Sequence, residues 1–143
     1  MRVARSALLL GLLFASPAFA GEFDAPPLRE CGPTSDSSCA YERQVLADQW
    51  PKALGGDYQS QRNIAFCLSD GCYDAMQVDK VAACAWRMVI VASGDPSVER
   101  GDLDNYVSAC RMGLSTDEQQ AARTTAERMF ILIYARRLPQ FNE

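Results

Sequence analysis

Cysteine offers this chain most of its chemistry, because histidine is absent from all 143 positions. Without histidine there is no Ser-His-Asp or Cys-His catalytic pair and no imidazole metal ligand. Six cysteines remain, at positions 31, 39, 67, 72, 84 and 110. If the chain is exported, as its first twenty residues predict (see below), an even number of cysteines in a small chain predicts three disulfides, although six cysteines can pair in many ways. Sequence neighbourhood suggests the pairs Cys31–Cys39, Cys67–Cys72 and Cys84–Cys110.

Two other uses of the cysteines fit their spacing less well. A zinc site needs close pairs of ligands, but Cys67 and Cys72 are separated by four residues and no second close pair accompanies them. A redox-active dithiol needs a low-pKa thiolate in a CxxC-like setting, which the sequence does not supply. We therefore expect structural disulfides, with no metal site and no cofactor.

Carboxylates form the other chemically interesting group, and they gather in two loop segments. Paired acids of this kind can serve a glycosidase as proton donor and base, or they can bind Ca²⁺. The second cluster does not fit a calcium loop, because Gly101 is misplaced for a loop that starts at Asp95. We interpret both sets as loop acids and helix caps and predict no catalytic residue. The two sets are Asp70, Asp74 and Asp79, and Asp95, Glu99, Asp102 and Asp104.

The first twenty residues are typical of a secretory signal. Arg2 and Arg5 precede an apolar run over 7–15, and Ala18-Phe19-Ala20 forms a cleavage signal, which predicts cleavage after Ala20 and a periplasmic or secreted protein. No later run is long enough to span a membrane. Removing Arg2 and Arg5 leaves 12 basic against 18 acidic residues, a net charge of −6. Nucleic-acid binding needs a positive field, so this charge argues against it.

Helical patterns dominate the rest of the chain, and no run alternates over a strand's length. Residues 21–38 form an irregular lead-in, and 39–143 form a single helical domain. A capping box, Ser115-x-x-Glu118, opens the last helix. The helix at 79–94 is apolar nearly all round and should be the buried centre. The expected helices cover 39–49 (limited by Pro51), 57–71, 79–94, 103–112 and 116–137.

The segment 57–94 resembles a Sel1-like repeat, a relative of the tetratricopeptide repeat. Its first helix carries the run 60–68, SQRNIAFCL, followed by Gly71, and its second carries 83–86, ACAW, followed by Ala92-Ser93-Gly94. Leu68 and Ala65 depart from the Tyr and Gly that the repeat prefers. Extended to 137, the resemblance implies a disulfide-stabilised, all-α stack of antiparallel helical hairpins with a long C-terminal helix. It also implies a non-catalytic interaction or scaffold protein that binds a protein or peptide.

The last helix offers a candidate partner contact. At 100° per residue, Ile131 falls on its polar side and Tyr134 near the edge of that side. Exposed apolar residues in such places can contact a partner, and we predict that role for these two. An alternative hypothesis is a small enzyme or inhibitor that acts on the cell envelope through the loop carboxylates. The sequence leaves the partner and the oligomeric state open.

Overall fold

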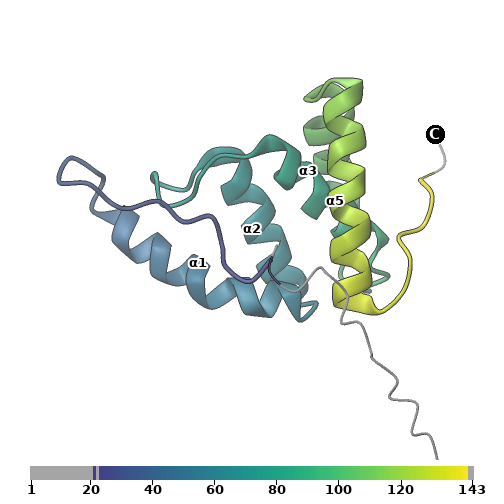
Figure 1. The fold of residues 1–143 in the computed structure, drawn as a ribbon, viewed down its shortest axis with the longest axis horizontal. Helices are drawn as coiled ribbons and strands as arrows, with labels where there is room; N and C mark the ends of the chain where they lie inside the picture. Colours follow the sequence, from purple (N-terminus) through teal and green to yellow (C-terminus); the bar gives the residue numbers. More distant parts are fainter. Residues whose placement is uncertain (1–20, 22, 142–143) are drawn as a thin grey trace, which may run out of the picture.

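The computed structural model describes residues 21 and 23–141, so the predicted signal peptide lies outside the described residues. Within them the chain is all-α, as predicted (Figure 1). No strand occurs in this part, and Leu28 and Met76 form an isolated antiparallel bridge. None of its helices is long and apolar enough to cross a membrane. The helices are α1 (Ser38–Leu54), α2 (Tyr58–Asp70), α3 (Lys80–Ala92), α4 (Arg100–Tyr106), the π-helix η1 (Val107–Met112) and α5 (Thr116–Tyr134).

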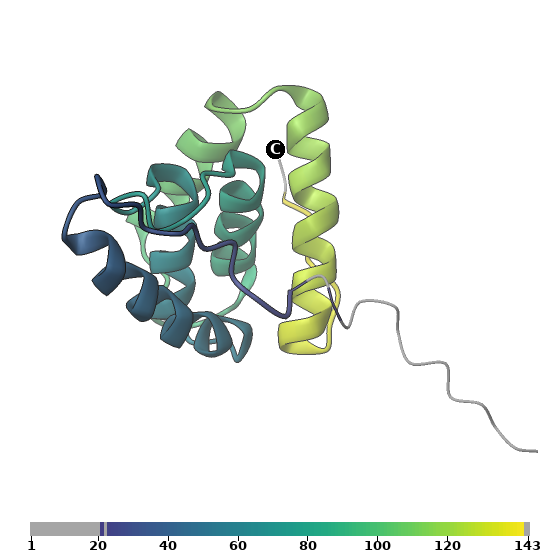
Figure 2. The same ribbon diagram turned by 60° about the vertical axis from the view of Figure 1, so that its left-hand side comes forward.

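Helix α3 is the centre of the fold, which confirms the prediction made from its apolar sequence. It packs against α2, α4, η1 and α5, and Figure 2 shows α5 running alongside it. Its residues from Ala83 to Ile90 are all buried. Trp86 meets Trp50 of α1 edge to face, with ring centroids 5.8 Å apart. Arg87 is the charged residue within this buried run.

Local signals define the start of most helices. The carboxylates of Asp57 and Asp79 accept hydrogen bonds from the backbone N–H groups of Ser60 and Ala82, both at 2.8 Å, and so cap α2 and α3. The predicted capping box of α5 is present, and hydrogen bonds from the backbone and side chain of Ser115 hold the pKa of Glu118 below its ordinary value.

Pro51 does not end α1, contrary to the sequence expectation. The helix runs on to Leu54, although proline lacks the N–H that would bond to the preceding turn. Trp50 and Ala53, on either side of it, are both buried. Their burial against the core holds the last turn in helical geometry, so tertiary packing overrides the local preference.

The fourth predicted helix is two elements. Helix α4 begins at Arg100, three residues before the expected start, because Glu99 and Asp102 form a capping box. The chain then widens into η1, which ends at Met112. Gly113 follows it, and an added Cβ there would lie 2.9 Å from the carbonyl oxygen of Ala109. At the other end of the domain, α5 stops at Tyr134 rather than near 137, with Ala135 in the left-handed region (φ 52°).

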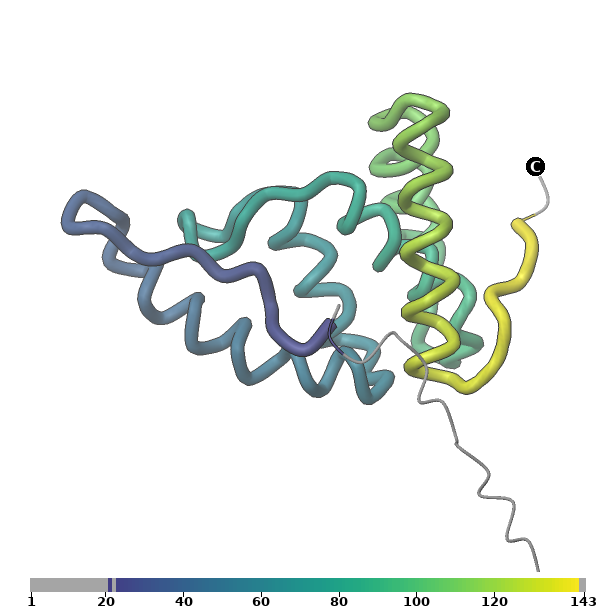
Figure 3. The backbone as a smooth tube through the Cα atoms, viewed as in Figure 1, coloured from purple at the N-terminus to yellow at the C-terminus, as the bar shows by residue number. Residues whose placement is uncertain are grey.

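The N-terminal lead-in is tied to the loop after α2. The N–H of Arg29 donates to the carbonyl of Ala75, and the N–H of Gln77 donates to that of Pro27, both at 2.9 Å. In Figure 3 this purple segment accordingly lies along that loop. Nearer its start, the carbonyl of Phe23 accepts a 2.8 Å hydrogen bond from the indole of Trp50. The lead-in is therefore part of the packed domain.

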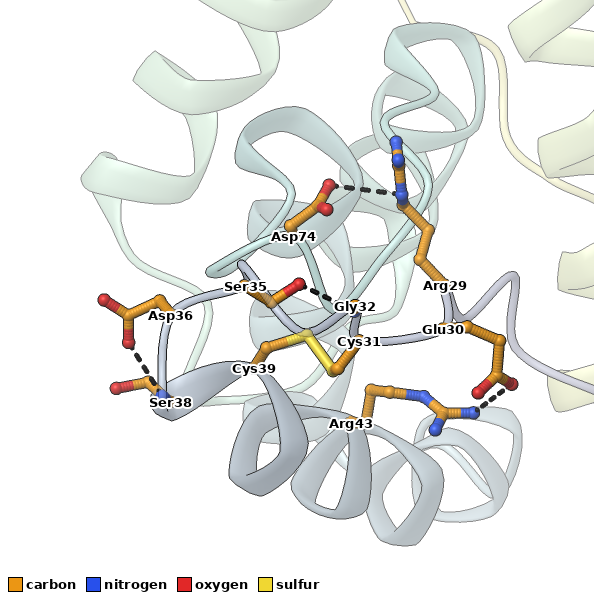
Figure 4. Close-up of a disulfide and its surroundings, with 10 residues drawn as sticks. All are labelled: Arg29, Glu30, Cys31, Gly32, Ser35, Asp36, Ser38, Cys39, Arg43 and Asp74. Atoms are coloured by element: carbon orange, nitrogen blue, oxygen red, sulfur yellow. Dashed lines mark hydrogen bonds and ion pairs between the residues drawn. A yellow bond between two sulfur atoms is a disulfide. The ribbon is translucent and has the colours of Figure 1, made fainter.

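Three disulfides staple the fold, and they are the pairs that sequence neighbourhood suggested. Cys31–Cys39 joins the lead-in to the first turn of α1, Cys67–Cys72 closes the end of α2, and Cys84–Cys110 joins α3 to η1. Figure 4 shows the first of them between two ion pairs, Arg29–Asp74 at 3.1 Å and Arg43–Glu30 at 3.0 Å.

Loop length predicts a ranking of these bridges. Cys84 and Cys110 are 26 positions apart and Cys67 and Cys72 only 5. Replacing both members of the longer bridge by alanine should lower the free energy of unfolding by about 3–4 kcal/mol, and of the shorter bridge by about 2 kcal/mol, because longer closed loops restrict the unfolded chain more. Urea unfolding of the two double variants measures this, and equal losses or the reverse order would contradict it.

Candidate functional site

A groove between α1 and α2 is a concave surface lined by both apolar and polar groups. Its volume is about 570 Å³. Helix α1 supplies one wall, α2 the other, and the loop closed by Cys67–Cys72 supplies one end. The lining residues are Tyr41, Glu42, Val45, Leu46, Gln49, Asn63, Phe66, Cys67, Asp70, Cys72 and Tyr73. We call this surface the α1–α2 groove.

Three aromatic rings line the α1–α2 groove and remain open to solvent. Tyr41, Phe66 and Tyr73 are 69 %, 54 % and 57 % exposed. Tyr73 lies in a run of three residues with positive φ, at 43°, 56° and 65°, just outside the short disulfide loop. Non-glycine residues adopt this conformation at an energetic cost, so the disulfide-closed turn fixes the backbone from which Tyr73 projects. Tyr73 is thus positioned by the disulfide-closed turn, whereas Tyr41 and Phe66 are carried by α1 and α2.

Three polar side chains in the α1–α2 groove carry acceptors that lack partners within the described part of the chain, whereas Asn63 accepts a 2.9 Å hydrogen bond from Gln59. The carboxylates of Glu42 and Asp70 form no hydrogen bond or ion pair there. The Oε1 atom of Gln49 is buried and also has no hydrogen-bond partner. No lysine or arginine lines the groove. A buried acceptor without a donor is unfavourable, so this arrangement favours a ligand that brings cationic or N–H donors.

The two predicted partner contacts on α5 lie apart from this groove. Ile131 is 49 % exposed beside the equally exposed Leu132. Tyr134 is half-buried, its hydroxyl lies 3.2 Å from the Nε2 atom of Gln61, and its ring packs on Phe130 with centroids 4.8 Å apart. Ile131 therefore offers an open apolar surface, whereas much of Tyr134 is used within the fold. Both stay predicted contacts.

Most loop carboxylates serve as caps, turns or ion-pair partners, as interpreted from the sequence. Asp79 caps α3, Asp95 accepts from the N–H of Ser97 at 2.7 Å, and Asp74 pairs with Arg29. Asp70 belongs to the α1–α2 groove, a role that the sequence did not reveal. In the part of the chain that the structure describes, no group of three His, Cys, Asp or Glu could hold a metal ion.

Asp102 is fully buried and forms a charge network that fastens α4 to α2. Its Oδ2 accepts hydrogen bonds from the Tyr58 hydroxyl at 2.6 Å and from the Glu99 N–H at 3.1 Å. Its Oδ1 lies 3.1 Å from Nε of Arg62, an ion pair without a well-directed hydrogen bond. Burial and the hydrogen bond to Asp102 raise the pKa of Tyr58 to about 12. Sequence reasoning singled out Asp102 but not Tyr58, which lies 44 positions away.

Comparison with protein-family models, curated proteins and solved structures finds no match to this chain. The helices and disulfides described above thus define its class, a disulfide-stapled all-α domain. The Sel1-like resemblance stays a prediction.

The Tyr58–Asp102 contact predicts a stability loss at alkaline pH. Tyr58 keeps its proton to about pH 12 in the folded chain, against an ordinary pKa of 10.0. Between these two pH values the unfolded chain binds fewer protons than the folded chain. The contribution of Tyr58 to the free energy of unfolding is therefore full below pH 10 and falls as the pH rises towards 12. Tyr58→Phe should remove this part of the decline in urea unfolding measured from pH 9 to 12.

Tyr41→Phe, at an exposed tyrosine, should leave the alkaline decline unchanged. The assignment would be wrong if all five tyrosines ionised together near pH 10 in the wild type, as monitored by phenolate absorbance.

Proposed function

We propose that this protein is an exported, non-catalytic interaction module that holds a basic, extended segment of a partner protein in the α1–α2 groove. The observation that carries the proposal is the set of unpaired acceptors, Glu42, Asp70 and the buried Oε1 of Gln49, beside three exposed aromatic rings. An exposed carboxylate, a half-buried carboxylate and a buried amide oxygen without a cation of their own are complementary to lysine or arginine side chains.

Arginine and lysine suit this surface in two ways. Their charged ends attract Glu42 and Asp70, and a guanidinium can also lie over the face of Tyr41, Phe66 or Tyr73. A backbone N–H of an extended segment can donate to Gln49 Oε1. The groove is lined from two helices and the disulfide-closed loop, so an extended segment can contact more of it than a single side chain can. The net acidic charge of the chain steers a basic partner towards it.

An exported location agrees with the oxidised state of the cysteines. All six cysteines are in disulfides, and disulfides persist in oxidising compartments. Together with the predicted signal peptide, this supports a periplasmic or secreted location. The Sel1-like resemblance points the same way, because that family is expected to provide scaffolds for partner proteins. The alternative hypothesis of an envelope enzyme or inhibitor is less well supported, because its carboxylates largely serve as caps and ion-pair partners.

Peptide binding tests the proposal. The probe is a fluorescent heptapeptide that alternates Arg and Leu, compared with the same peptide carrying Glu for Arg. The wild type should bind the Arg peptide and not the Glu peptide. Asp70→Asn and Tyr41→Ala should each weaken binding about three- to tenfold, because each removes one charge or cation–π contact. Fluorescence anisotropy measures the affinities, at roughly 50–150 mM salt so that the attraction between charges is not fully screened.

Matched controls lie outside the α1–α2 groove. Asp104→Asn removes an exposed carboxylate and Met112→Ala an exposed apolar side chain, and both should bind the Arg peptide like the wild type. Equal weakening by Asp104→Asn would show that net charge alone attracts the peptide. Loss of binding in Ile131→Asp with no effect of Tyr41→Ala would place the contact on α5 and overturn the groove.

A further inference from the structure

Arg87 is a buried cation without a protein partner. It lies in the middle of α3 and is only 7 % exposed. Within the described residues its guanidinium makes no hydrogen bond, ion pair or ring contact. Arg62 of α2, by contrast, pairs with both Asp102 and Glu99. Guanidinium carries five N–H donors and keeps its charge, so a mostly buried guanidinium without a protein partner has donors left for a ligand or water.

Asp102 does not neutralise Arg87. Its carboxylate already binds Tyr58, Arg62 and the Glu99 backbone. Burial lowers the pKa of Arg87, the negative charge of Asp102 opposes that shift, and the positive charge of Arg62 adds to it. The neighbourhood therefore contains two buried or half-buried arginines, Arg87 and Arg62, and one carboxylate, Asp102, which pairs with Arg62.

The Arg87 side chain faces a cavity of about 330 Å³ between α2, α3 and η1. Four polar side chains stand at its rim, all exposed: Ser69 of α2, Lys80 of α3, Asn105 of α4 and Ser108 of η1. Lys80, Asn105 and Ser108 form no hydrogen bond or ion pair within the described residues, although the charge of Lys80 also acts on Glu118. No carboxylate lines the cavity. In a chain with excess acid, this is a cationic, donor-rich pocket with a buried arginine at its floor.

We propose that this cavity binds the oxyanion group, carboxylate or phosphate, of a small ligand. The planar guanidinium of Arg87 matches such a group with two parallel N–H donors, and Lys80 adds a second positive charge at the entrance. Asn105 and Ser108 donate to the remaining oxygens, and the volume suits a small molecule. The Cys84–Cys110 bridge holds η1, which supplies Ser108 and Ala109, against the helix that carries Arg87.

Calorimetric titration of the oxidised, full-length mature protein with inorganic phosphate and with succinate tests this site. The wild type should bind at least one of the two anions, and the one that binds tells phosphate from carboxylate recognition. Arg87→Met should lose at least about tenfold in affinity, since hydrogen bonds to a charged group are removed. Lys80→Gln should weaken binding severalfold, and the exposed, distant Lys52→Gln should not.

Unfolding measurements provide the second readout. In anion-free buffer, Arg87→Met should be at least as stable as the wild type, because it replaces an unpaired buried charge by an apolar chain of similar length. Saturating phosphate or succinate should raise the melting temperature of the wild type and not of the variant. If Arg87→Met does not fold, the Nε–H NMR signal of Arg87 in the wild type must shift on titration with the anion. The proposal is overturned if neither anion binds, if Arg87→Met binds as tightly as the wild type, or if that signal stays unmoved.

Discussion

The burial of α3 on nearly all sides is the constraint on which the rest of the structure depends. Eight consecutive side chains, from Ala83 to Ile90, are withdrawn from water, and α2, α4, η1 and α5 all pack on this one helix. Apolar burial at roughly 25 cal/mol per Å² makes such a helix the main source of stability in a chain of this size. It also forces every other element to take its position relative to α3. The single charged side chain within the buried run is that of Arg87, which lines the cavity between α2, α3 and η1.

Cross-links compensate for the small size of the domain. A lone helical hairpin leaves apolar faces uncovered, and stacked repeats normally cover them. Here the lead-in, stapled by Cys31–Cys39, and the α4–η1 segment, stapled by Cys84–Cys110, cover α2 and α3 instead. The Asp102 network adds a polar fastening between α4 and α2. These disulfides and the Asp102 network fix the elements that pack on α2. The α1–α2 groove and the Arg87 cavity both involve α2 and share Phe66 as a lining residue.

Features encoded by neighbouring residues were predictable from the sequence, and those set by distant contacts were not. Asp57, Asp79 and the Ser115–Glu118 box cap their helices because a cap depends on residues three positions apart. The sequence expectation that Pro51 limits α1 is wrong because the burial of Trp50 and Ala53 outweighs the local effect of proline. The candidate sites were invisible for the same reason: that Gln49 and Arg87 lack partners is a property of the packed helices, and no sequence pattern distinguishes an unpaired arginine from a paired one.

Native-state hydrogen exchange tests the central role of α3 most directly. The account predicts that amides in the buried run of α3 exchange slowest, through global unfolding only, and that replacing Cys84 and Cys110 by alanine abolishes protection in α4 and η1 while α2 and α3 remain the most protected elements. Exchange in α3 as fast as in the exposed turns of α1, or unchanged protection of η1 without its bridge, would contradict it.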